Sequence, residues 1–125
     1  MVRYRYILAL GTGSIAYLLI LYRFLSYSQR NRLPGSVYET FAVVALVIGF
    51  IVTLGVTKRR YRTVGFVLLG ICVTHLLVMI ADYRQDPTSH NLGPIEFVVL
   101  CVYAAPAYAG AAIAHIVDYI RRQRA

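Results

Sequence analysis

The chain has 125 residues, 59% of them hydrophobic, with a mean hydropathy of +0.64 and a formal net charge of +8. This length supports a single domain, residues 1–125, and the apolar share exceeds the roughly 45–50% that is usual for soluble domains. The composition therefore argues against a soluble domain and favours an integral membrane protein.

Four stretches of the chain contain no Asp, Glu, Lys or Arg, and each is 17 to 21 residues long. A helix needs about 20 apolar residues to cross the hydrocarbon core of a bilayer, so each stretch is long enough to cross once. Strands of a membrane barrel would alternate apolar and polar residues, whereas these stretches are apolar all round. We therefore predict an all-α membrane protein with four transmembrane helices, at about 5–25, 37–57, 62–82 and 94–118.

The first stretch follows Arg3 and Arg5, as the apolar part of a secretory signal peptide would. Gly11 and Gly13 dilute it, which makes it the weakest of the four. Because Arg23 follows with no small-residue cleavage site nearby, we expect this stretch to be retained as a membrane anchor.

The four helices are expected to form two hairpins. A polar loop at 26–35 joins the first two helices, a basic turn at 58–62 joins the second to the third, and a loop at 83–93 leads into the fourth. With such short connections, an up-down-up-down bundle is the economical topology.

The two predicted hairpins echo each other in sequence. The tripeptide Arg-Tyr-Arg at 3–5 recurs at 60–62, and Glu39 recurs as Glu96, both at a spacing of 57 residues. One interpretation is a parallel repeat whose axis lies along the membrane normal. The other, which the sequence alone favours, is that any two transmembrane hairpins share basic starts and polar outer turns.

The basic residues are distributed unevenly between the two ends of the predicted helices. Nine are expected on one side (Arg3, Arg5, Lys58, Arg59, Arg60, Arg62, Arg121, Arg122 and Arg124) and four on the other (Arg23, Arg30, Arg32 and Arg84). The positive-inside rule then places both termini in the cytoplasm, in an N-in/C-in topology. The net charge thus reflects topology rather than nucleic-acid binding, and its expected partner is the anionic headgroups of the cytoplasmic leaflet.

Both outer loops end in sequences typical of helix starts. Ser36 and Glu39 stand in a Ser-x-x-Glu pattern, which predicts a capping box at the start of the second helix. Pro94 and Glu96 suit the first turn of the fourth helix, because proline lacks an amide hydrogen and a carboxylate complements the helix dipole.

Asp86, His90 and Glu96 lie within eleven residues in the second outer loop and are the candidates for a metal or catalytic site there. Asp, Glu and His are standard ligands of a zinc-type ion and also furnish acid–base pairs. Turn and cap roles explain much of the same pattern, since Asp86 before Pro87 is typical of a turn and Glu96 of a first helical turn. The spacing matches no known ligand motif, so turn and cap are favoured and His90 is left unassigned.

His75 is expected inside the third helix, at membrane depth. Ionisable groups there are costly and often functional, but a neutral histidine can also form a hydrogen bond across the bundle. Its possible partners are Thr74, Tyr17, Tyr103 and Tyr108. Because His115 lies closer to the inner end of its own helix, the two histidines differ in depth, and we expect neither haem nor another cofactor.

Other chemistry-bearing motifs are lacking in the sequence. Cys72 and Cys101 lie in apolar stretches without a CxxC motif, so small hydrophobic side chains are expected rather than a redox site. The chain shows no glycine-rich phosphate loop and no nucleophile elbow. The sequence therefore favours a protein that is not an enzyme.

The fourth helix is rich in small residues around a proline. Pro106 removes a backbone hydrogen bond, which predicts a kink. Ala105, Ala109, Gly110 and Ala114 allow another helix to approach closely. These features predict either a hinge, an oligomer interface or internal packing.

Residues 82–112 carry the outer-loop sequence DPTSHNLGPIEF followed by an apolar helix with many small residues. This segment resembles parts of small, uncharacterised bacterial four-helix integral membrane proteins. The resemblance implies a multi-pass location in the bacterial inner membrane, and it assigns no active residue.

Three hypotheses for function follow. The first is a non-enzymatic accessory or scaffold subunit that assembles with itself or with a partner membrane protein. The second is a small oligomeric transporter or channel, with Pro106 as a hinge and His75 in a polar pathway. The third is a membrane enzyme or metal-binding protein that works through His90, Asp86 and Glu96 at the outer face.

Overall fold

The computed structural model describes residues 2–23, 27–30, 34–56, 58–88 and 93–125, and in these ranges every regular element is a helix. The elements are α1 (Val2–Ala16), the π-helical segment η1 (Tyr17–Tyr22), α2 (Tyr27–Arg30), α3 (Ser36–Thr53), α4 (Arg60–Gln85), α5 (Gly93–Ala104) and α6 (Pro106–Arg124). Four segments are long and apolar enough to cross a membrane, as predicted: Arg3–Tyr22, Ser36–Thr53, Arg60–Gln85 and Gly93–Arg124.

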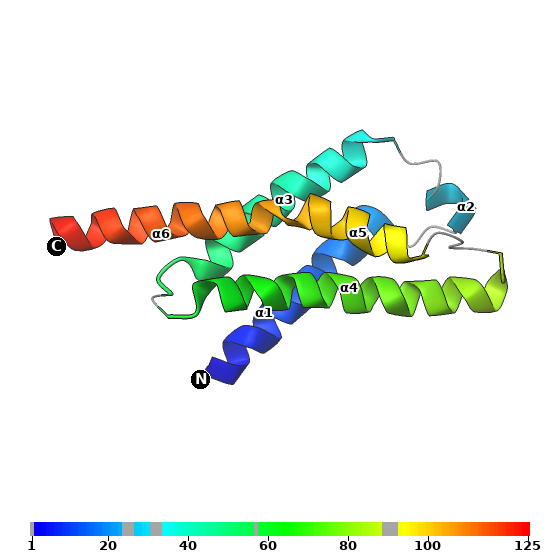
Figure 1. Cartoon of the computed structure of the whole chain (residues 1–125), viewed down its shortest axis with the longest axis horizontal. Helices are drawn as coiled ribbons and strands as arrows, with labels where there is room; N and C mark the ends of the chain where they lie inside the picture. The colour runs from blue at the N-terminus through cyan, green and yellow to red at the C-terminus, as the bar shows by residue number, and fades with distance from the viewer. Residues whose placement is uncertain (1, 24–26, 31–33, 57, 89–92) are drawn as a thin grey trace.

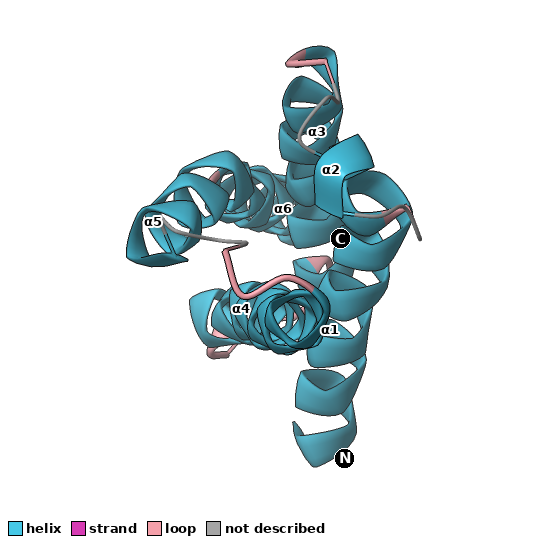
Figure 2. Ribbon diagram, turned by 90° about the vertical axis from the view of Figure 1, so that its right-hand side faces the viewer, coloured by secondary structure: helices cyan, strands magenta, loops and turns pink. Residues whose placement is uncertain are grey.

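The helices form two layers, and each layer is one hairpin. Hairpin 1 consists of α1, η1, α2 and α3, and hairpin 2 consists of α4, α5 and α6. Viewed from the side in Figure 1, α1 and α3 cross obliquely behind α4 and α6, and both chain ends lie away from α2. Figure 2 shows α1 and α3 on one side of the molecule and α4 and α5 on the other.

The backbones of the two hairpins are in close contact where α1 crosses α4. A methyl group on Gly13 would collide with the carbonyl of Val67, and a methyl group on Gly70 would collide with the carbonyl of Leu10. Small residues let helix backbones approach closely in membranes, where van der Waals packing drives association. The sequence therefore places glycine where the two hairpins touch.

The second crossing, between α3 and α6, has the same form. Here Gly49 meets the backbone of Ala107, and Gly110 meets the backbone of Leu46. In both crossings the contact is reciprocal, as at an interface built around a two-fold axis.

The spacing of these contacts matches an internal repeat. Gly70 lies 57 positions after Gly13, and Val67 lies 57 positions after Leu10, which is the spacing of the Arg-Tyr-Arg echo. In the second crossing, Gly110 lies 61 positions after Gly49, and Ala107 lies 61 positions after Leu46. The second hairpin therefore has four more residues before this crossing than the first hairpin has. These reciprocal contacts are the pattern expected of two hairpins related by an approximate two-fold axis, and they support the parallel-repeat interpretation.

Apolar side chains from both layers are buried between them. The largest fully buried side chains include Phe41, Ile71, Val64 and Val67, which come from both hairpins. Many large apolar side chains instead face outward, for example Leu19, which is 64% exposed. Such an extended exposed apolar surface is unusual for a soluble monomer and suits contact with lipid.

Several helix ends differ from the sequence-based bounds. The first helix changes to π-helical geometry at Tyr17 and ends before Arg23, which has a left-handed φ of 53°. The second helix ends at Thr53 rather than near 57. The predicted capping box is wrong, because Gly35 is the cap residue, no side chain caps this end, and Ser36 is already helical.

Pro106 divides the last long helix into α5 and α6 (Figure 1). Because proline has no amide hydrogen, the regular hydrogen-bond pattern is interrupted at this point. The amide of Ala105 still donates to the carbonyl of Cys101 at 2.8 Å, and the amide of Tyr108 donates to the carbonyl of Ala105 at 2.9 Å. The second bond spans only three residues, so the chain tightens at the proline before α6 continues.

Candidate functional site

A buried ion pair joins the short helix α2 to the far end of α4. The Nη2 atom of Arg30 lies 2.7 Å from each carboxylate oxygen of Asp82, and the two side chains are only 10% and 9% exposed. The guanidinium group of Arg30 also lies 4.8 Å from the ring centre of Tyr22. Helix α2 thus positions a cation that neutralises Asp82, which a chain crossing a membrane requires of a buried charge.

His75 lies two helical turns before Asp82 on the same side of α4 and is buried, with 6% of its surface exposed. Its Nδ1 atom is 2.6 Å from the hydroxyl of Tyr17, the first residue of η1. Its ring packs edge-on against Phe97 with centres 5.0 Å apart, and its Nε2 atom is 3.7 Å from a carboxylate oxygen of Glu96. Tyr17 was among the partners expected for His75, and the π-helical turn presents it there.

Five side chains from α2, α4, α5 and η1 make up this site, which we call the polar network. Its members are Tyr17, Arg30, His75, Asp82 and Glu96. The network contains two carboxylates, one permanent cation, one imidazole and one phenol. Such a set can hold or transfer a proton, because imidazole and carboxylate are the common acid–base groups of proteins. Short π-helical segments inside α-helices are also frequent at functional sites.

Of the residues predicted for an outer metal site, the described Asp86 and Glu96 make separate contacts. Asp86 is exposed and accepts hydrogen bonds from the amide of Thr88 at 3.0 Å and from its hydroxyl at 2.7 Å, which forms the expected turn. Glu96 instead faces His75. His90 lies outside the described residues, and within the described ranges no three His, Cys, Asp or Glu side chains are arranged to hold a metal ion.

The hydrogen bonds at Asp86 have an electrostatic consequence. The hydroxyl of Thr88, followed by its amide, lowers the pKa of the Asp86 carboxyl below its ordinary value. These donors stabilise the charged form, so Asp86 is an ionised turn residue at neutral pH.

A second buried ion pair lies at the opposite end of the molecule. Arg60 Nη2 is 2.6 Å from an oxygen of Asp118, and the same oxygen accepts the amide of Gly55 at 2.9 Å. Arg60 also donates to the carbonyl of Val56 at 2.6 Å. These bonds tie the turn between the hairpins to α6, and they withdraw Arg60 from the exposed basic set. No sequence pattern predicts a role for Asp118.

The small residues of the last helix face two directions. Gly110 and Ala114 are buried, and Gly110 contacts α3, whereas Ala105 and Ala109 are exposed. The predicted set therefore divides into an internal packing face and a face that points away from the bundle. His115 is also exposed, unlike the buried His75.

The two cysteines are neighbours across α4 and α5. The thiol of Cys72 lies within hydrogen-bonding reach of the thiol of Cys101, on the apolar part of both helices. Both are free thiols, one half-buried and one exposed. Both thiols lie on apolar parts of their helices, where free cysteines usually pack as small apolar side chains.

Taken together, the four candidate spans, the outward apolar surface and the buried ion pairs define a multi-pass helical membrane protein. No protein-family model, curated protein or solved structure matches the chain.

Proposed function

We propose that this chain is a non-enzymatic accessory or scaffold subunit of the bacterial inner membrane, which assembles with itself or with a partner membrane protein. The observation that carries this proposal is the close packing of the two hairpins. At Gly13, Gly49, Gly70 and Gly110 their backbones are in contact, so little room separates them at these crossings.

The surface of α5 and α6 supports this role. Ala105 and Ala109 are exposed one helical turn apart, where small side chains favour close approach of another helix. Beside Ala105, a groove of about 430 Å³ is lined by Phe97, Val98, Cys101 and Val102. The break at Pro106 places this groove and Ala109 on neighbouring parts of one surface.

For orientation, we propose that the helices alternate in direction across the membrane with both termini in the cytoplasm. The positive-inside rule supports this, because eight exposed basic residues gather at the end that carries both termini and the turn between the hairpins. We call this end the basic end. Its exposed cations are Arg3, Arg5, Lys58, Arg59, Arg62, Arg121, Arg122 and Arg124.

The assembly proposal is tested by measuring the mass of the protein released from a mild detergent by native mass spectrometry. Ala109→Leu is the test variant. We expect the wild-type protein at multiples of 14.0 kDa or together with a second chain, and we expect Ala109→Leu to release the single subunit. Ala81→Leu is the matched control, since Ala81 is also an exposed alanine but lies on α4. A wild-type protein that is monomeric, alone and stable under these conditions would contradict the proposal.

The polar network supports a second candidate, a small proton-linked transporter. The observation that favours this candidate is the buried Tyr17–His75 hydrogen bond beside Glu96, because ionisable groups at membrane depth commonly mark ion pathways. Proton flux into liposomes should then fall at least tenfold in His75→Ala. The matched control is His115→Ala, whose side chain is exposed and outside the network. Flux equal in wild type, in both variants and in empty liposomes excludes this candidate.

A further inference from the structure

Each hairpin carries an apolar groove on its own surface, near the basic end. In hairpin 1, a groove of about 410 Å³ is lined by Tyr4, Arg5, Leu8, Ala9 and Val52, between α1 and α3. In hairpin 2, a groove of about 390 Å³ is lined by Tyr61, Arg62, Gly65, Phe66, Leu69 and Tyr108, between α4 and α6.

The two grooves are equivalent under the internal repeat. Tyr61 and Arg62 lie 57 positions after Tyr4 and Arg5, the same spacing that relates the glycine contacts of α1 and α4. Each groove thus has a tyrosine and an arginine at equivalent positions on its first helix. Because this tyrosine–arginine pair recurs in both hairpins, it belongs to the repeat and does not depend on how one particular pair of helices packs.

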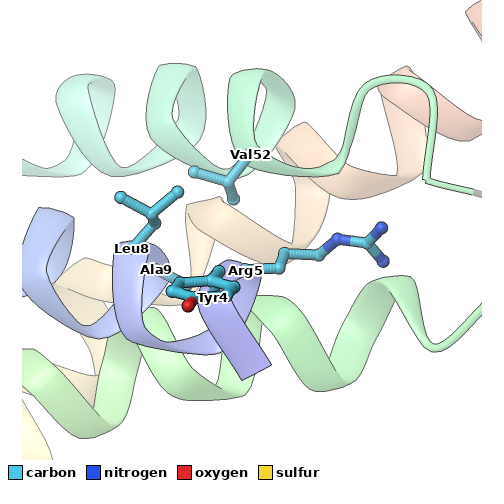
Figure 3. Close-up of a pocket in the computed structure, with 5 residues that line it drawn as sticks. All are labelled: Tyr4, Arg5, Leu8, Ala9 and Val52. Carbon is cyan, nitrogen blue, oxygen red and sulfur yellow. The ribbon is translucent and has the colours of Figure 1, made fainter. Parts of the chain in front are cut away.

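Each groove combines an apolar part with a cation. Figure 3 shows Leu8 and Val52 facing each other from α1 and α3, while the side chain of Arg5 extends beyond them. In the second groove, Tyr61 and Tyr108 stack with centres 6.3 Å apart. Arg62 is held beside it by the ring of Tyr6, whose centre is 5.5 Å from the guanidinium carbon.

The charge around both grooves is strongly positive. All five acidic residues lie in the described ranges, and among them Asp118 alone lies at the basic end, where it is bound to Arg60 and to the amide of Gly55. Exposed arginine near a membrane surface attracts anionic headgroups, and its guanidinium group forms strong hydrogen bonds with phosphate oxygens. Apolar groove walls, in turn, match an acyl chain.

We propose that the protein binds two anionic phospholipids, one in each groove. In each site an acyl chain lies along the apolar walls, and the headgroup phosphate contacts Arg5 in hairpin 1 or Arg62 in hairpin 2. The tyrosines Tyr4 and Tyr61 lie at the level of the headgroup, where aromatic residues with a polar tip are favoured. The inference is independent of assembly: a monomer with two bound lipids would contradict the scaffold proposal and support these sites.

Native mass spectrometry of the full chain, with phosphatidylglycerol or phosphatidylcholine added in parallel, tests the sites. We expect two phosphatidylglycerol molecules retained per chain, at least tenfold more than phosphatidylcholine at equal concentration. Arg5→Gln and Arg62→Gln should each lose one lipid, and the double variant both. Arg122→Gln is the matched control, because Arg122 is an exposed cation at the same end but lines neither groove.

A second variant separates the groove from the charge. Gly65→Leu leaves Arg62 in place and is designed to fill the second groove, and a Cβ atom at position 65 would meet only the Tyr108 hydroxyl, at an ordinary 3.8 Å. We expect this variant to retain one lipid and to unfold at the wild-type temperature. Equal lipid loss in Arg122→Gln and Arg5→Gln, or two lipids retained by Gly65→Leu, would overturn the proposal in favour of diffuse charge attraction.

Discussion

Among the residues that the structure describes, Asp118 alone places a negative side chain at the basic end, and its burial makes it sensitive to substitution. Asp118→Asn leaves the guanidinium group of Arg60 without its counter-charge in a site that is 6% exposed. Removing one partner of a buried ion pair costs about 3–5 kcal/mol, so we expect a loss of this order in the free energy of unfolding. SDS-driven unfolding followed by circular dichroism measures it.

The double variant Arg60→Leu/Asp118→Leu provides the comparison for this prediction. Because it removes both charges, we expect it to be less destabilised than Asp118→Asn, as buried pairs replaced by apolar residues often are. The exposed Arg122→Gln should change stability by less than about 0.5 kcal/mol. Destabilisation of Asp118→Asn no greater than that of Arg122→Gln would show that this pair does not hold the turn.

Asp86 offers a pH-dependent test at the scale of one turn. Its folded-state pKa is lowered, first by the Thr88 hydroxyl, so its contribution to the turn is complete above the ordinary carboxyl pKa of about 3.9. That contribution is lost as the pH falls through the lower, folded value. In Thr88→Val, which keeps the backbone amide but lacks the hydroxyl, the pKa of Asp86 should rise toward the ordinary value.

Carboxyl chemical shifts from NMR, recorded from neutral to acidic pH, measure this titration for wild type and Thr88→Val. The exposed Glu39 serves as the internal reference, because Thr88 has no hydrogen bond to it among those described. Identical titration of Asp86 in both proteins would mean that the Thr88 hydroxyl is not its main donor in solution.

The residues of the polar network were only partly predictable from the sequence. His75 stood out because an ionisable group in an apolar stretch is rare, and Tyr17 was among its expected partners. The Arg30–Asp82 pair was not expected, because the two residues are 52 positions apart and no sequence pattern in this polar loop predicts the short helix α2. Such pairing is decided by how the helices cross, which local sequence patterns do not specify.

At the scale of the helices, the length and apolarity of the sequence stretches predicted the number of membrane spans. They did not predict which helices pack against each other. Runs without charge mark the spans because the bilayer thickness sets their length. Helix neighbours depend on a few glycines, and the sequence has others, such as Gly11 and Gly65, that make no backbone contact between hairpins. The spacing of 57 residues was visible in the sequence, but its meaning required the reciprocal contacts of Gly13 and Gly70.

Two glycines one half-turn apart on α1 test the role of the crossing. Gly13→Ala places a methyl group against the carbonyl of Val67, so the helices must separate. Overpacking of this kind costs about 1–3 kcal/mol or more. Gly11→Ala meets no atom within 4 Å and should stabilise the helix by about 0.5–1 kcal/mol. Thermal unfolding in detergent compares the two, and a stable Gly13→Ala would contradict the crossing.

At the scale of the whole molecule, the two hairpins form a pseudo-dimer within one chain. The reciprocal glycine contacts provide the interface, and the Asp118 interactions fasten the connecting turn. This arrangement assigns different tasks to different surfaces. The inner faces join the hairpins, whereas we propose that the grooves near Arg5 and Arg62 bind lipid and that the outer face of α5 and α6 serves assembly.

If the closest contacts lie between hairpins, the covalent link between them is dispensable for association. We therefore expect fragments 1–57 and 58–125, produced together in one membrane, to co-purify in a 1:1 complex through an affinity tag on either fragment. Gly49→Leu in the first fragment should abolish the complex, because its side chain would occupy the backbone position of Ala107. Gly11→Leu, which points into open space on the same fragment, should leave it intact. Equal recovery with both variants would place the contact between hairpins elsewhere, and the internal two-fold relationship would no longer explain how the chain folds.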